Sequence, residues 1–131
     1  MGDVIPTEFL DLFEKRAFGH LATIMPDGSP QVSPLWVDFD GQYLILNSEK
    51  GRQKDLNMRR ERRVAVEVQD PQDPYRYILI RGEVVEVTEK GAEEGIDRMS
   101  MRYTGKKYRE NNPGGVRVIY KILPLHVRTS K

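Results

Sequence analysis

The chain has 131 residues, with 21 basic and 20 acidic side chains, and a formal net charge of +1. This length suits one domain over residues 1–131, and a net charge near zero argues against general nucleic-acid binding. The absence of cysteine excludes a disulfide framework and a thiolate nucleophile. The amino terminus lacks the pattern of a signal peptide, and no apolar run is long enough to span a membrane. We therefore expect a cytoplasmic protein with no membrane or nucleic-acid partner.

The sequence carries none of the common catalytic motifs. It contains no G-x-S-x-G, Walker A or G-x-G-x-x-G run. His20 and His126 stand far apart without a histidine or cysteine nearby, so they do not predict a zinc site. We expect no metal ligands, and we expect the chemistry to come from a bound cofactor.

A helix and a hairpin are predicted first. Thr7 is a favourable N-cap residue, and Phe9 and Phe13 share one helical face, so we expect a helix over about Thr7–Arg16. The run HLATIM then predicts a strand. Asp27-Gly28 predicts a tight turn into a second strand, QVSPLWVDF.

Pro34 lies inside this second strand. Because proline cannot donate a hydrogen bond to a neighbouring strand, the position predicts an edge, a bulge or a ligand contact. Asp40-Gly41 predicts another hairpin turn, into the third strand YLILNS. The basic segment Gly51–Arg60 is expected to form a short helix. The alternating run RVAVEVQD then predicts a fourth strand.

Two strands and a helix are predicted in the remaining chain. YRYILIRGEVVEV predicts a long fifth strand, bent at Gly82, and Thr88 is expected to cap a helix that ends at about Tyr103, before Gly105. VRVIYKILPLHV predicts a sixth strand, interrupted or ended near Pro124. Six antiparallel strands with few helices close best on themselves, so we expect a mainly β fold, a small six-stranded antiparallel barrel.

Positive charge is concentrated in one short segment, residues 51–63. This segment contains two acids and the following basic residues: Arg52, Lys54, Arg59, Arg60, Arg62 and Arg63. Such a run is often a solvated surface. It also suits an anion, because arginine forks bind phosphate and the N-terminus of a helix offers free N–H groups.

The order of motifs resembles the pyridoxamine 5'-phosphate oxidase-like split β-barrel superfamily, and within it the flavin/deazaflavin oxidoreductases that use coenzyme F420. The resemblance covers about residues 15–125 and rests on L-A-T-x-x-x-D-G-x-P, S-P-L-W, G-R-x-K-x-x-N and a late R-G-E-V. It implies a split barrel of the FMN-binding type and a homodimer with cofactor clefts at the interface.

The resemblance also implies which residues hold the cofactor. Arg52 and Lys54 would grip the phosphate of the ribityl arm, and main-chain groups near Ser33 would contact the ring. Arg59 and Arg60 are expected to extend the positive field toward the polyglutamate tail of a deazaflavin. The cofactor-binding residues expected in this chain are Gln31, Ser33, Pro34, Leu35, Trp36, Ser48, Gly51, Arg52, Lys54 and Asn57.

Five aromatic or apolar side chains have two interpretations each. Trp36 could cover the ring or belong to the core. Tyr75 and Tyr77 lie in a region that, by resemblance, reaches the partner subunit's cofactor; alternatively they form a solvent-facing strand edge. Met99 and Tyr103 belong to a helical stripe with Ala92 and Ile96, and we interpret them as core.

Three functions are compatible with the sequence. The first is an F420-dependent reductase that transfers a hydride from the reduced cofactor to an unsaturated small-molecule substrate. The second is an FMN-binding protein of the same superfamily. The oxidase itself is disfavoured, because the chain ends in LPLHVRTSK without the longer basic tail. The third is a non-enzymatic binder of haem, a tetrapyrrole or surplus cofactor.

Overall fold

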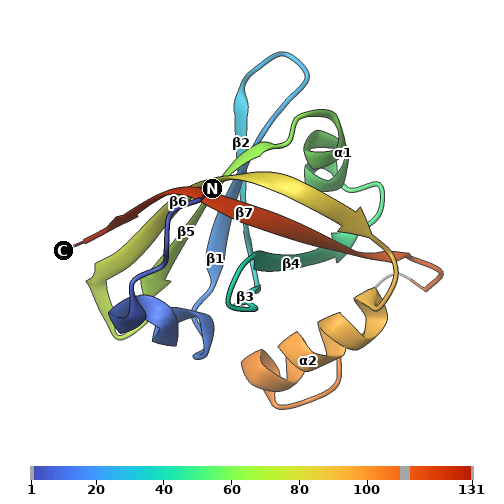
Figure 1. The fold of residues 1–131 in the computed structure, drawn as a ribbon. Helices are drawn as coiled ribbons and strands as arrows, with labels where there is room; N and C mark the ends of the chain where they lie inside the picture. The colour runs from blue at the N-terminus through green and yellow to red at the C-terminus, as the bar shows by residue number, and fades with distance from the viewer. Residues whose placement is uncertain (1, 110–112, 131) are drawn as a thin grey trace.

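The fold is a single curled antiparallel sheet with short helices outside it. The structure, a computed structural model, describes residues 2–109 and 113–130. Figure 1 shows the curled sheet with α2 below it. The elements are η1 (Thr7–Phe13), β1 (Gly19–Ile24), β2 (Pro30–Leu35), β3 (Val37–Phe39), β4 (Leu44–Glu49), α1 (Gln53–Arg60), β5 (Arg63–Asp70), β6 (Asp73–Thr88), α2 (Ala92–Thr104) and β7 (Arg117–Thr129).

The sheet has seven strands in the order β2-β1-β5-β6-β7-β4-β3. The prediction of six strands is therefore wrong, although the mainly β, barrel-like class is confirmed. The second predicted strand is two strands, because β2 pairs with β1 whereas β3 pairs with β4. The chain changes partner at Trp36, between Leu35 and Val37. The two edge strands are thus consecutive in the chain, and β2 is an edge strand, as Pro34 indicated.

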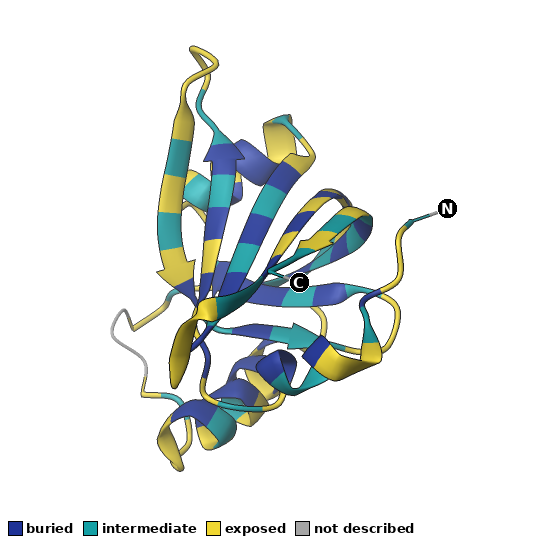
Figure 2. Ribbon diagram, turned by 90° about the vertical axis from the view of Figure 1, so that its left-hand side faces the viewer, coloured by how far each residue is buried: buried dark blue, intermediate teal, exposed yellow. Residues whose placement is uncertain are grey.

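The core lies inside the curl, where alternate residues of each strand point inward. Figure 2 shows this alternation of buried and exposed positions along the strands. Val64, Val66 and Val68 of β5 are buried, as their spacing predicted. Leu21 and Ile122 are at most 1% exposed. A large apolar side chain buried in this way stabilises the fold by roughly 1.5–3 kcal/mol.

The first helix differs from its prediction. It is a 3-10 helix that ends at Phe13, and Pro6, not Thr7, is its N-cap residue, without a side-chain cap. Three residues per turn place Phe9 and Leu12 on one face, and both are buried in the core. Burial of the apolar face, not a capping bond, therefore determines where this helix lies.

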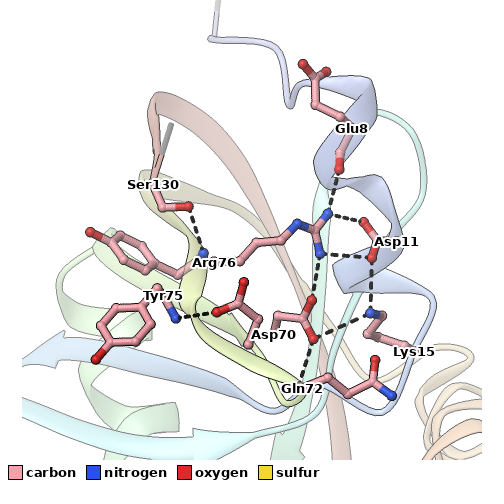
Figure 3. Close-up of polar contacts among 10 residues, drawn as sticks. Glu8, Asp11, Lys15, Asp70, Gln72, Tyr75, Arg76 and Ser130 are labelled. Carbon is pink, nitrogen blue, oxygen red and sulfur yellow. Dashed lines mark hydrogen bonds and ion pairs between the residues drawn. The ribbon is translucent and has the colours of Figure 1, made fainter.

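A cluster of ion pairs joins η1 to the hairpin between β5 and β6. Arg76 of β6 contacts Asp11 at 2.6 Å and Asp70 at 2.9 Å, and Lys15 lies 3.2 Å from Asp11 and 3.5 Å from Asp70. Arg76 also donates to the main-chain carbonyl of Glu8. Figure 3 shows the guanidinium between the two carboxylates. We call Asp11, Lys15, Asp70 and Arg76 the N-terminal ion cluster; each of its cations meets a carboxylate.

The C-terminal half agrees with the prediction except at two boundaries. The register of β6 against β7 shifts between Arg81 and Gly82, which confirms the bend. Of the two alternatives predicted near Pro124, the interruption is confirmed and the end is not: β7 bulges at Leu125 and continues to Thr129. α2 begins after Gly91, not at Thr88, because β6 extends through that threonine. Gly105 ends α2 in the left-handed conformation, as expected.

Candidate functional site

The start of α1 is held rigidly where β4 ends. Gly51, at φ +94°, turns the chain out of the strand. Asp55, which is 1% exposed, accepts hydrogen bonds from the Gly51 N–H at 2.9 Å and the Tyr120 hydroxyl at 2.5 Å, and it pairs with Arg59 at 2.9 Å. Burial would raise the pKa of Asp55, but these bonds outweigh it and hold the pKa below its usual value. The first turn of α1 is therefore preorganised.

Asn57 fixes the helix to β1. Its amide nitrogen donates to Thr23 Oγ1 at 3.0 Å, and its oxygen accepts from Gln53 and from Arg60. Thr23 in turn donates to Gln31 Oε1 of β2 at 3.0 Å. Asn57 therefore ties α1 to the two strands beside it, and its expected contact with a cofactor stays a prediction.

Three cations gather around this helix start. Lys54 is half-buried, and its Nζ donates to Ser33 Oγ of β2 at 3.3 Å. Burial lowers the pKa of Lys54, and the charges of Arg52 and Arg117 lower it further. Arg52 forms an ion pair with Glu49, whose Oε2 lies 3.5 Å from its guanidinium. We call Arg52, Lys54 and Arg117 the cationic site.

Ser48 adds an unused polar group to this region. It lies in β4, is 4% exposed, and its hydroxyl has no hydrogen-bond partner among the described residues. A buried hydroxyl without a partner is costly. The structure thus brings Ser48 of β4, Gly51 and Arg52 of the turn, and Lys54 of α1 to the place where the strand passes into the helix. Their role in binding a cofactor stays a prediction.

The basic segment divides into two parts. Its first part, Arg52 and Lys54, faces the cationic site, whereas the later arginines are engaged elsewhere. Arg59 pairs with Asp55, and Arg60 donates to the carbonyl of Ile24. Arg62 donates to the Val84 carbonyl, and Arg63 pairs with Glu61. These contacts give the later arginines roles in fixing α1 and β5.

Sequence analysis missed Arg117, because it lies 63 positions after Lys54 in a segment read only as a strand. Its Nε donates to Asn47 Oδ1 at 3.0 Å, and its guanidinium lies 4.9 Å from the ring centre of Tyr108. Burial lowers the pKa of Arg117. A charged residue at the first position of the strand, followed by three apolar or aromatic residues, was the only signal in the sequence.

The β2 segment presents two faces. Gln31, Ser33 and Leu35 alternate with the exposed Val32 and Pro34, and the inward set includes the partners of Lys54 and Thr23. Trp36 follows β2 and stacks on Tyr103, with ring centres 5.2 Å apart, and meets Tyr108 edge-on. The indole is thus turned toward α2, and its aromatic contacts continue through Tyr108 to Arg117.

Tyr75 and Tyr77 lie apart from the cationic site. They begin β6, where Tyr77 pairs with Gln69 at the end of β5, whereas α1 precedes the opposite end of β5. Tyr75 is 85% exposed. At roughly 3.3 Å per residue along β5, about 20 Å separates these tyrosines from the helix. Met99 and Tyr103 are buried in the α2 stripe, as predicted.

Two other kinds of site receive no support. Within residues 2–109 and 113–130, no three histidine or acidic side chains are grouped so that they could hold a metal ion. Over the same ranges, no helix is both long and apolar enough to cross a membrane.

Comparison with known proteins gives one family. The family model of pyridoxamine 5'-phosphate oxidase matches residues 5–131. An F420 reductase is 32% identical, with a TM-score of 0.85 over 97% of this chain and 100% of that chain. A conserved hypothetical protein from Mycobacterium tuberculosis is 28% identical, with a TM-score of 0.73 over 98% of this chain and 87% of that one.

General Stress Protein 26 from Bacillus anthracis shares the fold at 18% identity and a TM-score of 0.71, covering 93% of this chain and 91% of that chain. No curated protein matches the chain. The match of the family model over nearly the whole chain confirms the resemblance stated from the motifs. The chain belongs to the pyridoxamine 5'-phosphate oxidase family.

Proposed function

We propose that the chain is an oxidoreductase that uses coenzyme F420 to reduce an unsaturated small molecule. The observation that carries this proposal is the placement of Arg52 and Lys54 at the start of α1, beside Ser33 of β2. The 32% identity to an F420 reductase supports the choice of a deazaflavin. The cytoplasmic location stays a prediction.

The residues present fit a ribityl phosphate. Two cations and the first N–H groups of a helix favour an anion there, and the buried hydroxyl of Ser48 has no partner among the described residues. Lys54 is half-buried with a neutral hydroxyl as its hydrogen-bond partner. Burying a charge without a counter-ion is unfavourable, so an arriving phosphate would relieve this cost.

The protein's own contribution is binding and orientation. When bound, reduced F420 supplies a hydride for a two-electron reduction of an electron-poor double bond. Arg52 and Lys54 would fix the phosphate, and the edge strand from Gln31 to Leu35 would position the ring with its main-chain groups. Hydride transfer needs close and fixed contact between donor and acceptor, which the rigid attachment of α1 through Asp55 and Asn57 supports.

FMN is the second candidate cofactor, favoured by the family match itself. It carries the same ribityl phosphate, so Arg52 and Lys54 would serve it equally. A non-enzymatic binder of a cofactor or haem would use the same fold without turnover. These alternatives differ from the first proposal in the preferred ligand or in the absence of reduction.

We also propose that a second copy of the chain covers the outer face of the sheet. This face carries Val32, 67% exposed, and Leu79, 40% exposed, around a depression of about 640 Å³. Its other lining residues include Ala22, Ala65 and Val127. A cofactor cleft between two copies would bring Tyr75 and Tyr77 of one subunit toward the cationic site of the other.

The cofactor proposal is tested by titrating the protein with F420 and, separately, with FMN, following Trp36 fluorescence and heat. We expect micromolar or tighter binding of F420 and weaker binding of FMN, followed by oxidation of reduced F420 when an activated enone is added. Tighter binding of FMN than of F420 would support the second candidate, an FMN-binding protein. Tight F420 binding without turnover on any acceptor of a panel would support the non-enzymatic binder.

The dimer proposal is tested by light scattering at micromolar concentration. We expect twice the chain mass for the native protein and the chain mass for the variant Val32→Glu/Leu79→Glu. Met101→Glu, which adds a carboxylate at an exposed apolar position of α2, is the matched control and should remain dimeric. A native protein that is monomeric under these conditions contradicts the shared cleft.

A further inference from the structure

Arg117 is held in an unusual environment for a charged side chain. It is half-buried, and its Nε and one terminal nitrogen contact neutral groups, Asn47 Oδ1 at 3.0 Å and the Tyr108 hydroxyl at 3.4 Å. Asn47 is itself buried and anchored, since its amide donates to the Ala92 carbonyl at the start of α2 at 2.8 Å. The guanidinium is therefore positioned by neutral side chains from β4 and from the segment after α2.

The charges around Arg117 do not cancel. Arg52 lowers the pKa of Arg117, and both arginines lower that of Lys54, so the three positive charges act on one another. Among the described residues, Glu49 is the carboxylate that forms an ion pair with this group, through Arg52 at 3.5 Å, and its field also acts on Arg117. Glu89, Glu93 and Glu94 line a surface depression beside Arg117 without an ion pair to it among the described contacts. Asp55 is engaged by Arg59. Within ion-pairing distance, three cations therefore face one carboxylate, and the cationic site keeps an excess of positive charge.

We propose that Arg117 is a further anion-binding residue of this site and that it makes the site selective for a ligand that presents two negative charges. Arg52 and Lys54 at the helix start bind the first charge, and Arg117, fixed by Asn47 and Tyr108, binds the second. This inference rests on the phosphate site proposed above and specifies the charge of its ligand.

Two ligands of the proposed class supply this charge differently. FMN carries both negative charges on one phosphate monoester, whose second ionisation occurs near pH 6. F420 has its tail of carboxylates beyond the phosphate, so a carboxylate would supply the second charge. The chemistry that Arg117 recognises is the same in both cases, a second anionic oxygen group close to the first.

The test uses methyl phosphate and dimethyl phosphate, which differ by one negative charge at pH 8. Their binding is followed by NMR, including the Nε–H resonance of Arg117. We expect the native protein to bind methyl phosphate more tightly than dimethyl phosphate by about tenfold. Arg117→Gln should weaken methyl phosphate by about tenfold or more, the loss typical of a charged hydrogen bond, and leave dimethyl phosphate nearly unchanged. Arg117→Lys, which keeps the charge, should restore part of the preference.

The outcomes separate this inference from the function on which it rests. If F420 binds but Arg117→Gln keeps the native preference, or if the native protein has no preference, the role of Arg117 is wrong and the proposed function stands. If neither F420 nor a phosphate binds the native protein, both are wrong. If Arg117→Gln loses more affinity for F420 than for FMN, the second negative charge that Arg117 binds is a carboxylate. If it loses more affinity for FMN, the second charge lies on the phosphate.

Discussion

The molecule contains two clusters of basic side chains that differ in how their charges are balanced. In the N-terminal ion cluster, Arg76 and Lys15 meet Asp11 and Asp70. In the cationic site, Arg52, Lys54 and Arg117 meet only Glu49 among the described carboxylates. In the first cluster each cation is paired with carboxylates, whereas the second keeps an excess of positive charge that could bind an anionic ligand.

This difference predicts a structural role for the N-terminal ion cluster and a ligand-binding role for the cationic site. Balanced ions at the junction of η1 with the sheet stabilise the contact between two segments of the chain (Figure 3). Cations that repel one another and are partly buried work against folding. Perturbed charges of the second kind are typical of functional sites. Substitutions in the two clusters should therefore have opposite effects on stability and on ligand binding.

The largest expected effect is that of Arg52→Ala/Lys54→Ala on cofactor affinity. Each side chain would lose a charged hydrogen bond to phosphate, worth about 1.5–3 kcal/mol. We expect F420 affinity to fall about 100-fold or more in calorimetric titration, with the free energy of unfolding unchanged or slightly raised. Lys90→Ala/Arg98→Ala removes one lysine and one arginine from exposed positions and is the matched control. Native affinity in the first variant would exclude the phosphate site.

Arg76→Ala should have the converse effect. The change leaves Asp70, which is 7% exposed, without its arginine, and breaks the link from β6 to η1. We expect a loss of about 2 kcal/mol in the free energy of unfolding, measured in urea, which is less than for a fully buried pair because Arg76 and Asp11 are partly exposed. F420 affinity should stay within about twofold. A large loss of affinity with native stability would reverse the roles of the two clusters.

The sequence predicted the local parts of the fold well. Strand positions, the turns at Asp27-Gly28 and Asp40-Gly41, and the stripe of α2 follow from alternation, turn residues and helical spacing, which are local signals. Arg52 and Lys54 could be proposed because they lie two positions apart. Their approach to Ser33 follows from the pairing of β2 with β1 and the packing of α1 on it.

Long-range features had no such signal. The split of one predicted strand at Trp36 depends on which strand each half pairs with, and pairing partners are not encoded in alternation. Arg117 joins the cationic site because β7 pairs with β4, which places Arg117 opposite Glu49. Thr7 is a good N-cap by type, but burial of Phe9 and Leu12 decided the geometry of η1.

Tyr120→Phe tests how far the position of the α1 start depends on the hydrogen bond from Tyr120 to Asp55. The Tyr120 hydroxyl is buried and donates to Asp55 at 2.5 Å, and burial together with this carboxylate raises the pKa of the phenol. Loss of one such bond should cost about 1–2 kcal/mol of stability in urea unfolding. Asp55 keeps Gly51 and Arg59 as partners, so F420 affinity should fall less than about threefold. A loss equal to that of Arg52→Ala/Lys54→Ala would show that the helix start depends on this one bond.

The smallest expected effect is a pH dependence of stability that comes from the N-terminal ion cluster. The hydrogen bond from Arg76 lowers the pKa of Asp11 from 3.8 to about 2. A carboxylate with a lowered pKa in the folded state stabilises the protein above its unfolded pKa, and this contribution is lost as the pH falls from about 4 toward 2.

The difference in unfolding free energy between the native protein and Arg76→Ala should therefore be constant from pH 7 to pH 5 and shrink below pH 4. Asp11 is 42% exposed, and solvent screening keeps the change well below the value that its pKa shift alone implies. Urea titrations of both proteins between pH 7 and pH 3 measure it. Lys90→Ala/Arg98→Ala, which removes two exposed cations, serves as the comparison, and its difference from the native protein should stay constant as the pH falls. If the difference in unfolding free energy stays constant down to pH 3, Arg76 stabilises the junction through its hydrogen bond to the Glu8 carbonyl and its packing over Phe9. Its ion pairs with Asp11 and Asp70 would then contribute little.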